Sequence, residues 1–288
     1  MTSDQIAKAL QKLKGKPIII ASHPRSGTHI TIDLFRRQFA ECQSWKYWGE
    51  NTNRLYLSVE ALYLGGGRTP ISEATAVAVL RRVPRPLVKT HLLFADIPVG
   101  EATKPGCLGR YWMTILNQRT RLAYVYRDGR SVMCSHQVFK MRVDPQARGS
   151  IGQFIRQNEG GVSRAKAWAN HVRTSLAYPH VVPIRCEDLI ADTAAMIDRL
   201  ARDFDLTPLH RAPLMPAKLR NTWHGRLVHL FGVRPESTAL LGRYKGQSPA
   251  KWQTAFTRED RQFFWDEAGD MLAELGYESS DAWIDQGG

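Results

Sequence analysis

The chain has 288 residues, 43% hydrophobic and 23% charged, and its 40 Lys and Arg against 27 Asp and Glu give a formal net charge of +13. These numbers suit one large α/β domain or two small ones, and the widely spaced four cysteines, with no C-x-x-C, argue against a zinc site or a disulfide framework. The basic surface would attract a polyanion, which could be nucleic acid, a membrane face or a charged nucleotide, but a generally basic soluble protein explains the charge almost as well. The longest apolar run near the N-terminus, 18–21, is too short for a signal peptide or a membrane span, so we expect a cytoplasmic protein with reduced thiols.

The first predicted elements are a buried strand over 17–21 and a helix over 28–39, joined by the turn Ser22-His-Pro-Arg-Ser-Gly27. A glycine in such a turn lets backbone N–H groups close on an anion, and the helix N-terminus adds its positive end. Arg25 adds N–H donors, and Ser26 and Thr28 add hydroxyls. The turn therefore predicts a phosphate-binding corner, with an ordinary strand-to-helix connection as the alternative. The loop G-x-x-x-x-G-K-[ST] of nucleotide triphosphatases is absent.

After an aromatic-rich stretch over 45–64 and a helix that Ser72 could cap, a short strand over 87–89 leads into Lys89-Thr-His91. Two residues that lie two apart on an extended chain point to the same side. The pattern therefore predicts a fixed cation beside a group that can take a proton near neutral pH. The alternative is a loop histidine satisfied by hydrogen bonds.

A third strand, over 122–126, ends at Arg127 and is followed by a helix that carries His136 and Phe139. Open α/β sheets bind ligands at the carboxyl ends of their strands, which is where Arg127 would lie. Ser135 follows two helical turns later and could place a hydroxyl near the same anion. The alternative is an arginine paired with Asp128.

Further elements are predicted over 163–177 (helix), 181–184 (strand), 192–204 (helix) and 258–275 (amphipathic helix). Between them, 206–245 has no clear period and leads into the basic loop Gly242-Arg-Tyr-Lys-Gly246, which could fold over an anionic ligand. The alternation of strands and helices predicts a single α/β domain over 1–288, with a core of about 17–275. It consists of a mainly parallel sheet flanked by helices, with a P-loop-like phosphate-binding corner.

Together these motifs resemble the cytosolic-type sulfotransferase family, over residues 17 to about 257. The family order is a P-[KR]-S-G-T loop after the first strand, then K-T-H-L, then R with S eight residues on, then E-D-L after a strand (here 187–189), then a basic K-G loop before W and F-T. The chain departs from the pattern at Ile30, where tryptophan is usual, at Cys186, where tyrosine is usual, and in an R-Y-K-G loop in place of R-K-G.

The resemblance implies transfer of a sulfuryl group from PAPS (3'-phosphoadenosine 5'-phosphosulfate) to a hydroxyl or amine of a small-molecule acceptor, leaving PAP and needing no metal. It implies that His91 is the general base and that Lys89 and Arg25 stabilise the transferred charge. The residues it implies for donor binding are Arg25, Ser26, Gly27, Thr28 and the adjacent His29 at the 5'-phosphosulfate, Arg127, Ser135, Arg243, Lys245 and Gly246 at the 3'-phosphate, and Trp223 at the adenine.

The alternative enzyme is a P-loop-type nucleotide or small-molecule kinase, which would require a G-K-[ST] loop and a magnesium-binding acid. Neither is evident in the sequence. A nucleic-acid-binding protein is disfavoured because the basic residues are scattered. An aromatic or lipid-like acceptor would suit a pocket lined by aromatic residues. The candidates for its lining are Trp45, Tyr47, Trp48, His136, Phe139 and the stretch 206–231. At least half of these aromatics are expected in the core instead. A glycan or peptide acceptor, and a homodimer, are left open.

Overall fold

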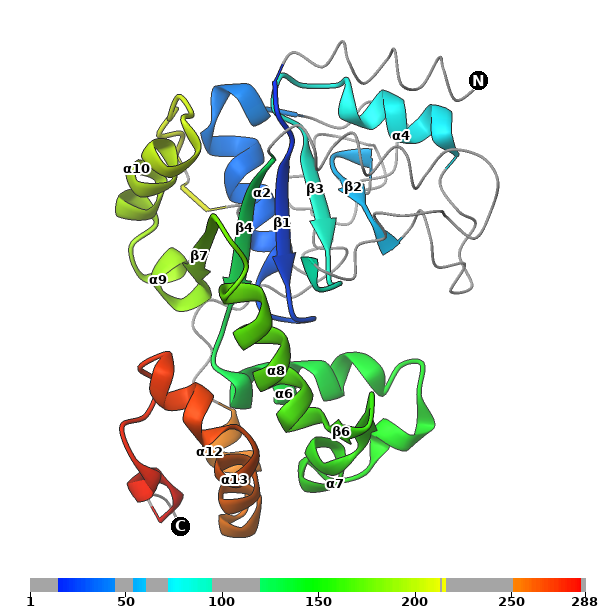
Figure 1. Ribbon diagram of the computed structural model, residues 1–288, viewed down its shortest axis with the longest axis vertical. Coiled ribbons are helices and arrows are strands. Elements are labelled where there is room, and N and C mark those ends of the chain that lie inside the picture. Colours follow the sequence, from blue (N-terminus) through cyan, green and yellow to red (C-terminus); the bar gives the residue numbers. More distant parts are fainter. Residues whose placement is uncertain are drawn as a thin grey trace, which may run out of the picture.

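A parallel sheet organises the computed structural model of the chain, which describes residues 15–44, 54–60, 72–94, 120–212, 214–215 and 251–285. Its strands are β1 (Ile18–Ser22), β2 (Leu57–Ser58), β3 (Leu87–Thr90), β4 (Arg121–Tyr126) and β7 (Val181–Arg185). They lie in the order β2-β3-β1-β4-β7, and every pair is parallel (Figure 1). The carboxyl ends of all these strands therefore meet at one edge of the sheet. The predicted α/β fold with a mainly parallel sheet is confirmed.

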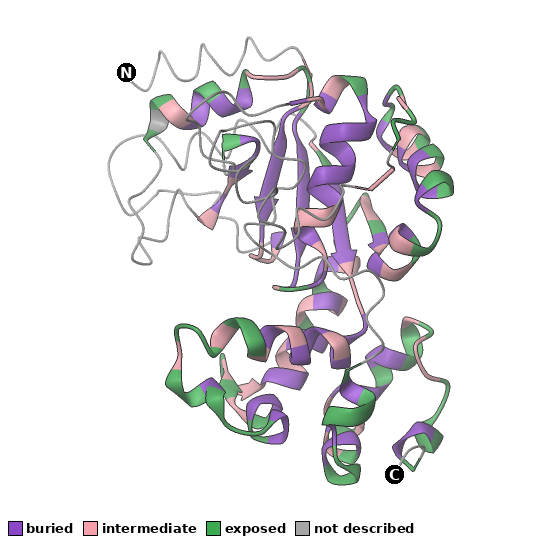
Figure 2. Ribbon diagram, turned by 180° about the vertical axis from the view of Figure 1, so that it is seen from behind, coloured by how far each residue is buried: buried purple, intermediate pink, exposed green. Residues whose placement is uncertain are grey.

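The central strand β1 is buried on both faces because its residues alternate between two apolar cores. Ile18 and Ile20 face the core formed with α2 (Thr28–Gln38), α9 (Cys186–Ala191) and α10 (Thr193–Phe204). Ile19 and Ala21 face the core formed with the helices α4 (Glu73–Leu80), α6 (Gly129–Lys140), α8 (Arg164–Leu176) and α13 (Arg258–Glu274). Helices thus cover both faces of the sheet, as the sequence predicts, and Figure 2 shows the buried strands between them.

Side-chain caps set the starts of most helices. Ser72 accepts a hydrogen bond from the backbone of Thr75 at the start of α4, and Asp192 caps α10 in the same way. Thr257 and Asp260 form a reciprocal capping box at the start of α13. Each such cap contributes about 1 kcal/mol to helix stability. The helices predicted from Ser72 and Asp192 are therefore confirmed to within two residues of their ends.

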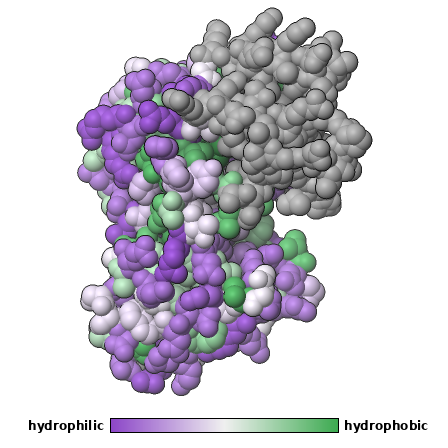
Figure 3. Space-filling view, viewed as in Figure 1, coloured by the Kyte–Doolittle hydropathy of each residue, from purple (hydrophilic) through white to green (hydrophobic). Residues whose placement is uncertain are grey.

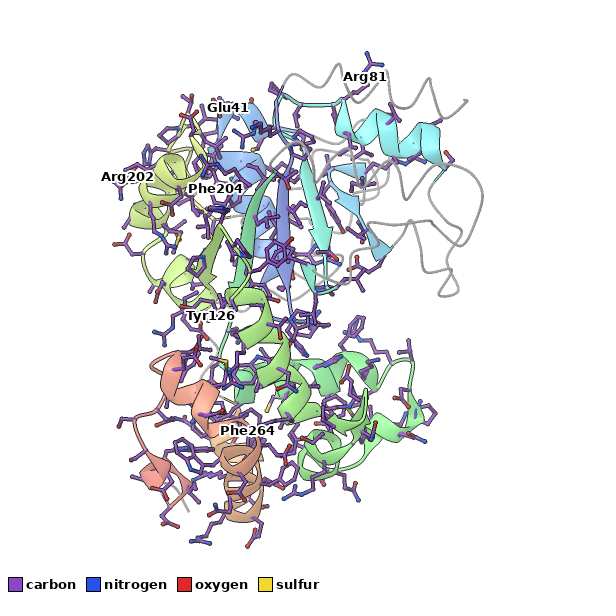
Figure 4. All side chains as sticks on the ribbon, in the orientation of Figure 1. Glu41, Arg81, Tyr126, Arg202, Phe204 and Phe264 are labelled. Atoms are coloured by element: carbon purple, nitrogen blue, oxygen red, sulfur yellow. The ribbon has the colours of Figure 1, made fainter. Side chains whose placement is uncertain are left out.

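The carboxyl ends of the strands point toward a helical half that contains α6, α7 (Ile151–Arg156), α12 (Trp252–Ala255) and α13 (Figure 1). Tyr126, at the end of β4, lies between the sheet and these helices, whereas Glu41 and Phe204 lie toward the opposite end (Figure 4). Trp168 of α8 is fully buried in this half. A Cβ at Gly129 would lie 2.6 Å from its indole ring, so the absent side chain allows α6 to start against α8.

Arg130 joins the C-terminal elements to the start of α6. Its guanidinium lies 3.8 Å from the ring centroid of Trp252 and 4.5 Å from that of Trp283. It also donates to both carboxylate oxygens of Asp128 and to Glu278. A buried arginine with this many partners fixes the beginning of α6, which follows directly on the strand end at Arg127.

The remaining short elements are η1 (Ala40–Cys42), η4 (Pro145–Arg148), the hairpin of β5 (Asn158–Glu159) and β6 (Val162–Ser163), and η5 (Asp281–Ile284). On the face that Figure 3 shows, most of the coloured surface is hydrophilic. Among the described helices, none combines the length and apolar character that a bilayer crossing requires. Cys42, Cys134 and Cys186 are free and buried, while Cys107 lies outside the described residues.

Candidate active site

The loop between β1 and α2 has the backbone of an anion-binding corner. Gly27, the N-cap of α2, has φ +107°, and Arg25 has φ +74°. The backbone N–H of Ser26 donates to the carbonyl of His23 at 3.2 Å, which closes the turn. A non-glycine residue in the left-handed region costs about 1–3 kcal/mol, and such residues concentrate at ligand-binding loops. The local strain at Arg25 therefore supports the predicted phosphate-binding corner over an ordinary connection.

The hydroxyl side chains of this corner are buried, whereas Arg25 is exposed. Ser22 and Thr28 share a hydrogen bond of 2.5 Å between their hydroxyl oxygens. Ser26 has no exposed surface, and its hydroxyl has no hydrogen-bond partner among the described residues. A buried hydroxyl without a partner costs about 1–3 kcal/mol. An anion in the loop would remove that cost by accepting a hydrogen bond from the Ser26 hydroxyl.

Like-charged guanidinium groups gather beside the corner. The Nε of Arg25 donates to the hydroxyl of Ser135 at 3.2 Å, and its guanidinium lies 5.3 Å from the ring centroid of Phe139. Burial lowers the pKa of Arg25, and the positive charges of Arg142 and Arg127 lower it further. The structure thus brings together three of the predicted donor-binding residues, Arg25, Arg127 and Ser135, in a cluster that attracts anions.

Arg127 leaves the carboxyl end of β4 with its charge available to that cluster. The sequence alternative, a pairing with Asp128, is wrong, because Arg130 occupies both oxygens of that carboxylate. Within the described part of the chain Arg127 forms no ion pair. Its neighbour Asp128 donates its backbone N–H to Glu187, of the E-D-L motif, at 3.1 Å. This glutamate therefore anchors the start of α6.

Lys89 and His91, at the end of β3, meet a carboxylate from the end of β2. Glu60 accepts hydrogen bonds from the hydroxyl of Thr90 at 3.1 Å and from the backbone N–H of His91. Its other oxygen lies 3.8 Å from the Nζ of Lys89. Although burial would raise it, the positive charge of Lys89 and the hydrogen bonds from Ser58 and from the His91 backbone bring the pKa of Glu60 below its ordinary value. Glu60 therefore ties the predicted cation and the predicted base to one carboxylate.

The ring of His91 is oriented by the strand that precedes the corner. Its Nδ1 lies 2.8 Å from the carbonyl oxygen of Ser22. Because a carbonyl only accepts, Nδ1 carries the proton in the neutral ring and Nε2 keeps its lone pair. Burial lowers the pKa of His91 to about 4, with Lys89 lowering it and Glu60 opposing the shift. His91 is therefore a neutral imidazole near pH 7, and it can accept a proton at Nε2.

The other predicted site residues divide between the site, the core and the parts of the chain not described. His29 packs the edge of its ring on Tyr56, and burial together with Lys89 lowers its pKa to about 3. His136 is buried, whereas Phe139 is 44% exposed beside Arg25. The predictions for Trp45, Tyr47, Trp48, Trp223, Arg243, Lys245 and Gly246 lie outside the described residues.

Sequence reasoning missed Glu60 and His171, both of which contact the segment around His91. The strand before Glu60 has only two residues, so no alternating pattern announces it. His171 lies on α8, where a lone histidine is usually a core residue. The available signal for Glu60 was an acidic residue directly after the mostly apolar stretch 55–59.

The fold and this site define an α/β protein with a cluster of cationic and hydroxyl side chains at the carboxyl edge of a parallel sheet, where β1 has neighbours on both sides. A family model described as "Sulfotransferase domain" matches residues 16–211, which is more than half of the chain. The chain therefore belongs to the sulfotransferase family.

Solved structures resemble this fold at low sequence identity. Retinol dehydratase in a complex with retinol and PAP aligns with a TM-score of 0.54 and 17% identity, covering 93% of this chain and 86% of that one. Mouse sulfotransferase SULT7A1 complexed with PAP aligns with a TM-score of 0.46 and 13% identity, covering 99% and 95%. No curated protein sequence matches the chain. At 17% identity, the likeness to retinol dehydratase supports the fold alone, and the chemistry has to be argued from the site.

Proposed function

We propose that this sulfotransferase moves a sulfuryl group from PAPS to a hydroxyl or amine of a small-molecule acceptor, with His91 as the general base. The observation that carries the proposal is the bond from the Nδ1 of His91 to the carbonyl of Ser22. It places a neutral imidazole with its Nε2 lone pair beside the last residue before the anion-binding corner. Ser22, the last residue of β1, thus contacts the proposed base and also leads directly into the anion-binding corner.

The residues of the corner suit the two anionic ends of such a donor. The buried, unpartnered hydroxyl of Ser26 and the donors of Arg25 would hold the 5'-phosphosulfate. Arg127 and Ser135 would hold the 3'-phosphate, where a guanidinium can make paired N–H contacts with phosphate oxygens. The retinol dehydratase named above was solved with PAP, which supports the same ligand class here.

When bound, PAPS supplies the sulfuryl group and a phosphate leaving group. His91 takes the acceptor proton on Nε2 while the acceptor oxygen or nitrogen bonds to sulfur and the electrons of the breaking S–O bond move onto the phosphate. Lys89 and Arg25 stabilise the negative charge on the sulfuryl and bridging oxygens. Glu60 forms an ion pair with Lys89, with 3.8 Å between its Oε2 and the Nζ of the lysine.

The test is turnover of radiolabelled PAPS with a panel of phenols, alcohols, amines, lipids and glycans. A positioned base contributes about 10²- to 10⁴-fold, so His91→Ala should lose that much turnover while keeping its affinity for PAP. His180→Asn, at an exposed histidine, is the control and should behave as wild type. Normal turnover by His91→Ala would reject the assignment of the base.

Nucleotide binding is tested separately by calorimetry with PAP, and with ATP plus and minus magnesium. Loss of a charge-assisted contact costs about 1.5–3 kcal/mol, so Arg127→Ala should bind PAP roughly 10- to 100-fold more weakly. Arg148→Ala, at an exposed arginine of η4, should not change the affinity. Tighter binding of magnesium-ATP than of PAP would favour the kinase alternative. The single domain over 1–288, the cytoplasmic location and a homodimer stay predictions.

A further inference from the structure

A half-buried histidine and a buried tyrosine form a hydrogen-bonded pair that contacts the backbone of His91 from the side of α8. The Nε2 of His171, on α8, lies 2.9 Å from the carbonyl oxygen of His91. The Nδ1 of the same ring lies 2.8 Å from the hydroxyl of Tyr124, in β4. Tyr124 has no exposed surface, and the two rings stack with their centroids 5.8 Å apart. The contact therefore links two central elements of the fold to one peptide group.

The direction of these bonds follows from the acceptor at one end. The carbonyl of His91 can only accept, so Nε2 of His171 donates to it. In the neutral ring Nδ1 then has the lone pair, and the hydroxyl of Tyr124 donates to it. Hydrogen-bond donation therefore runs from Tyr124 to His171 and from His171 to the carbonyl of His91. Both bonds require the same tautomer of His171, with the proton on Nε2.

This contact matters because His91 lies just beyond the last residue of β3, Thr90, where the hydrogen-bond ladder of the sheet has ended. Three groups from three different elements then hold it. Glu60 accepts from its backbone N–H, His171 donates to its carbonyl, and the carbonyl of Ser22 accepts from its ring. Without the bond from His171, the peptide after His91 would lose its anchor to the helical half.

We propose that Tyr124 and His171 form a positioning pair that sets the place of the His91 imidazole for proton transfer. This inference rests on the proposed function, because it assumes that His91 is the base. Neither residue is proposed to touch the acceptor or the donor. A displacement of about 1 Å in a reacting group can cost 10²-fold in rate, so the pair acts on kcat and leaves donor affinity unchanged.

The chain offers a matched pair of substitutions at His171. A glutamine places its amide N–H near the position of Nε2 and can still donate to the His91 carbonyl. An asparagine is equally polar but too short, and it reaches only the position of Nδ1. We expect His171→Asn to lose about 10- to 100-fold in kcat with unchanged KM for PAPS and unchanged affinity for PAP. We expect His171→Gln to keep kcat within about 3-fold of wild type.

Two further variants complete the experiment. Tyr124→Phe removes one hydroxyl from a buried ring and should lower kcat by about 3- to 10-fold, which keeps the proposal testable if His171→Asn does not fold. Asn170→Ala, at the exposed neighbour on α8, should leave kcat unchanged. Thermal unfolding and PAP calorimetry on every variant separate loss of fold from loss of positioning.

The outcomes separate the pair from the base. If His91→Ala is inactive while His171→Asn and Tyr124→Phe have the kcat of the wild type, the proposal of a positioning pair is wrong and the proposed function stands. If kcat falls by the same factor in His171→Gln and in His171→Asn, the ring of His171 only fills space, and the proposal of a positioning pair is again wrong. If His91→Ala itself keeps normal turnover, the proposed base fails, and the pair fails with it.

Discussion

Gly27 offers a quantitative test of how the anion-binding corner is built. Its backbone has φ +107° and ψ 12°, outside the left-handed basin that other residues tolerate, so an alanine would cost about 1–3 kcal/mol in strain. Its Cβ would also lie 2.5 Å from the Sγ and 3.3 Å from the Cβ of Cys186. Overpacking of this kind costs about another 1–3 kcal/mol. We therefore expect Gly27→Ala to lower the free energy of unfolding by about 2–6 kcal/mol.

The two costs can be separated with Cys186→Ala, which removes the sulfur and leaves only the 3.3 Å contact. Urea unfolding of the wild type, both single variants and the double variant gives the coupling free energy. We expect the double variant to recover about 1–3 kcal/mol relative to the sum of the singles, because the steric cost disappears while the strain stays. Additivity within about 0.5 kcal/mol would refute the proposed clash. PAP calorimetry on the same proteins should show weaker binding wherever Gly27 is replaced.

Three more predictions follow from the charges of the site. Glu60→Gln removes the charge that raises the pKa of His91, so an NMR titration should place that pKa below about 4, and an unchanged or higher value would contradict the geometry. Four histidines have pKa values that burial lowers, two of them buried (His23 and His136) and two half-buried (His29 and His91). The unfolded chain therefore binds more protons than the folded one below about pH 6.5. The free energy of unfolding should fall between pH 7 and pH 4 by up to about 1.4 kcal/mol per pH unit for each of them. His136→Phe should flatten that slope in urea unfolding, and an unchanged slope would count against a neutral His136. Arg130→Lys should lower the free energy of unfolding by about 2–4 kcal/mol, because one ammonium cannot replace the paired hydrogen bonds of the guanidinium to Asp128. A decrease no larger than that of the exposed control Arg148→Lys would contradict this.

Local patterns predict most of the described elements because the physics there is local. The apolar run 18–21 can only be buried, and Ser72 and Asp192 satisfy helix N–H groups that lie two or three residues away. The strand order could not be predicted in this way. It depends on the pairing of β1 with β3 on one side and β4 on the other, which no short window of sequence contains.

The same distinction separates the site residues that the sequence predicts from those that it does not. Arg25, His91 and Arg127 each follow a strand, and the carboxyl ends of parallel strands necessarily meet at one edge. Their proximity therefore follows from the fold class alone. Glu60 and His171 act through a backbone group of another segment, and such contacts depend on how elements pack. A sequence pattern cannot distinguish them from a surface acid and a core histidine.

Three features of the corner are unfavourable in the protein alone, and a bound anion would offset two of them. Arg25 has strained backbone, its positive charge lies near those of Arg127 and Arg142, and the Ser26 hydroxyl is buried without a partner. Each of these features costs free energy in the protein alone, and neither packing nor solvation of the surface explains all three at once. A bound anion would relieve the repulsion and accept from the hydroxyl in one step. Because the rest of the fold already holds these groups in place, little reorganisation is needed on binding, which is the condition under which electrostatic stabilisation of a transferring group is strongest.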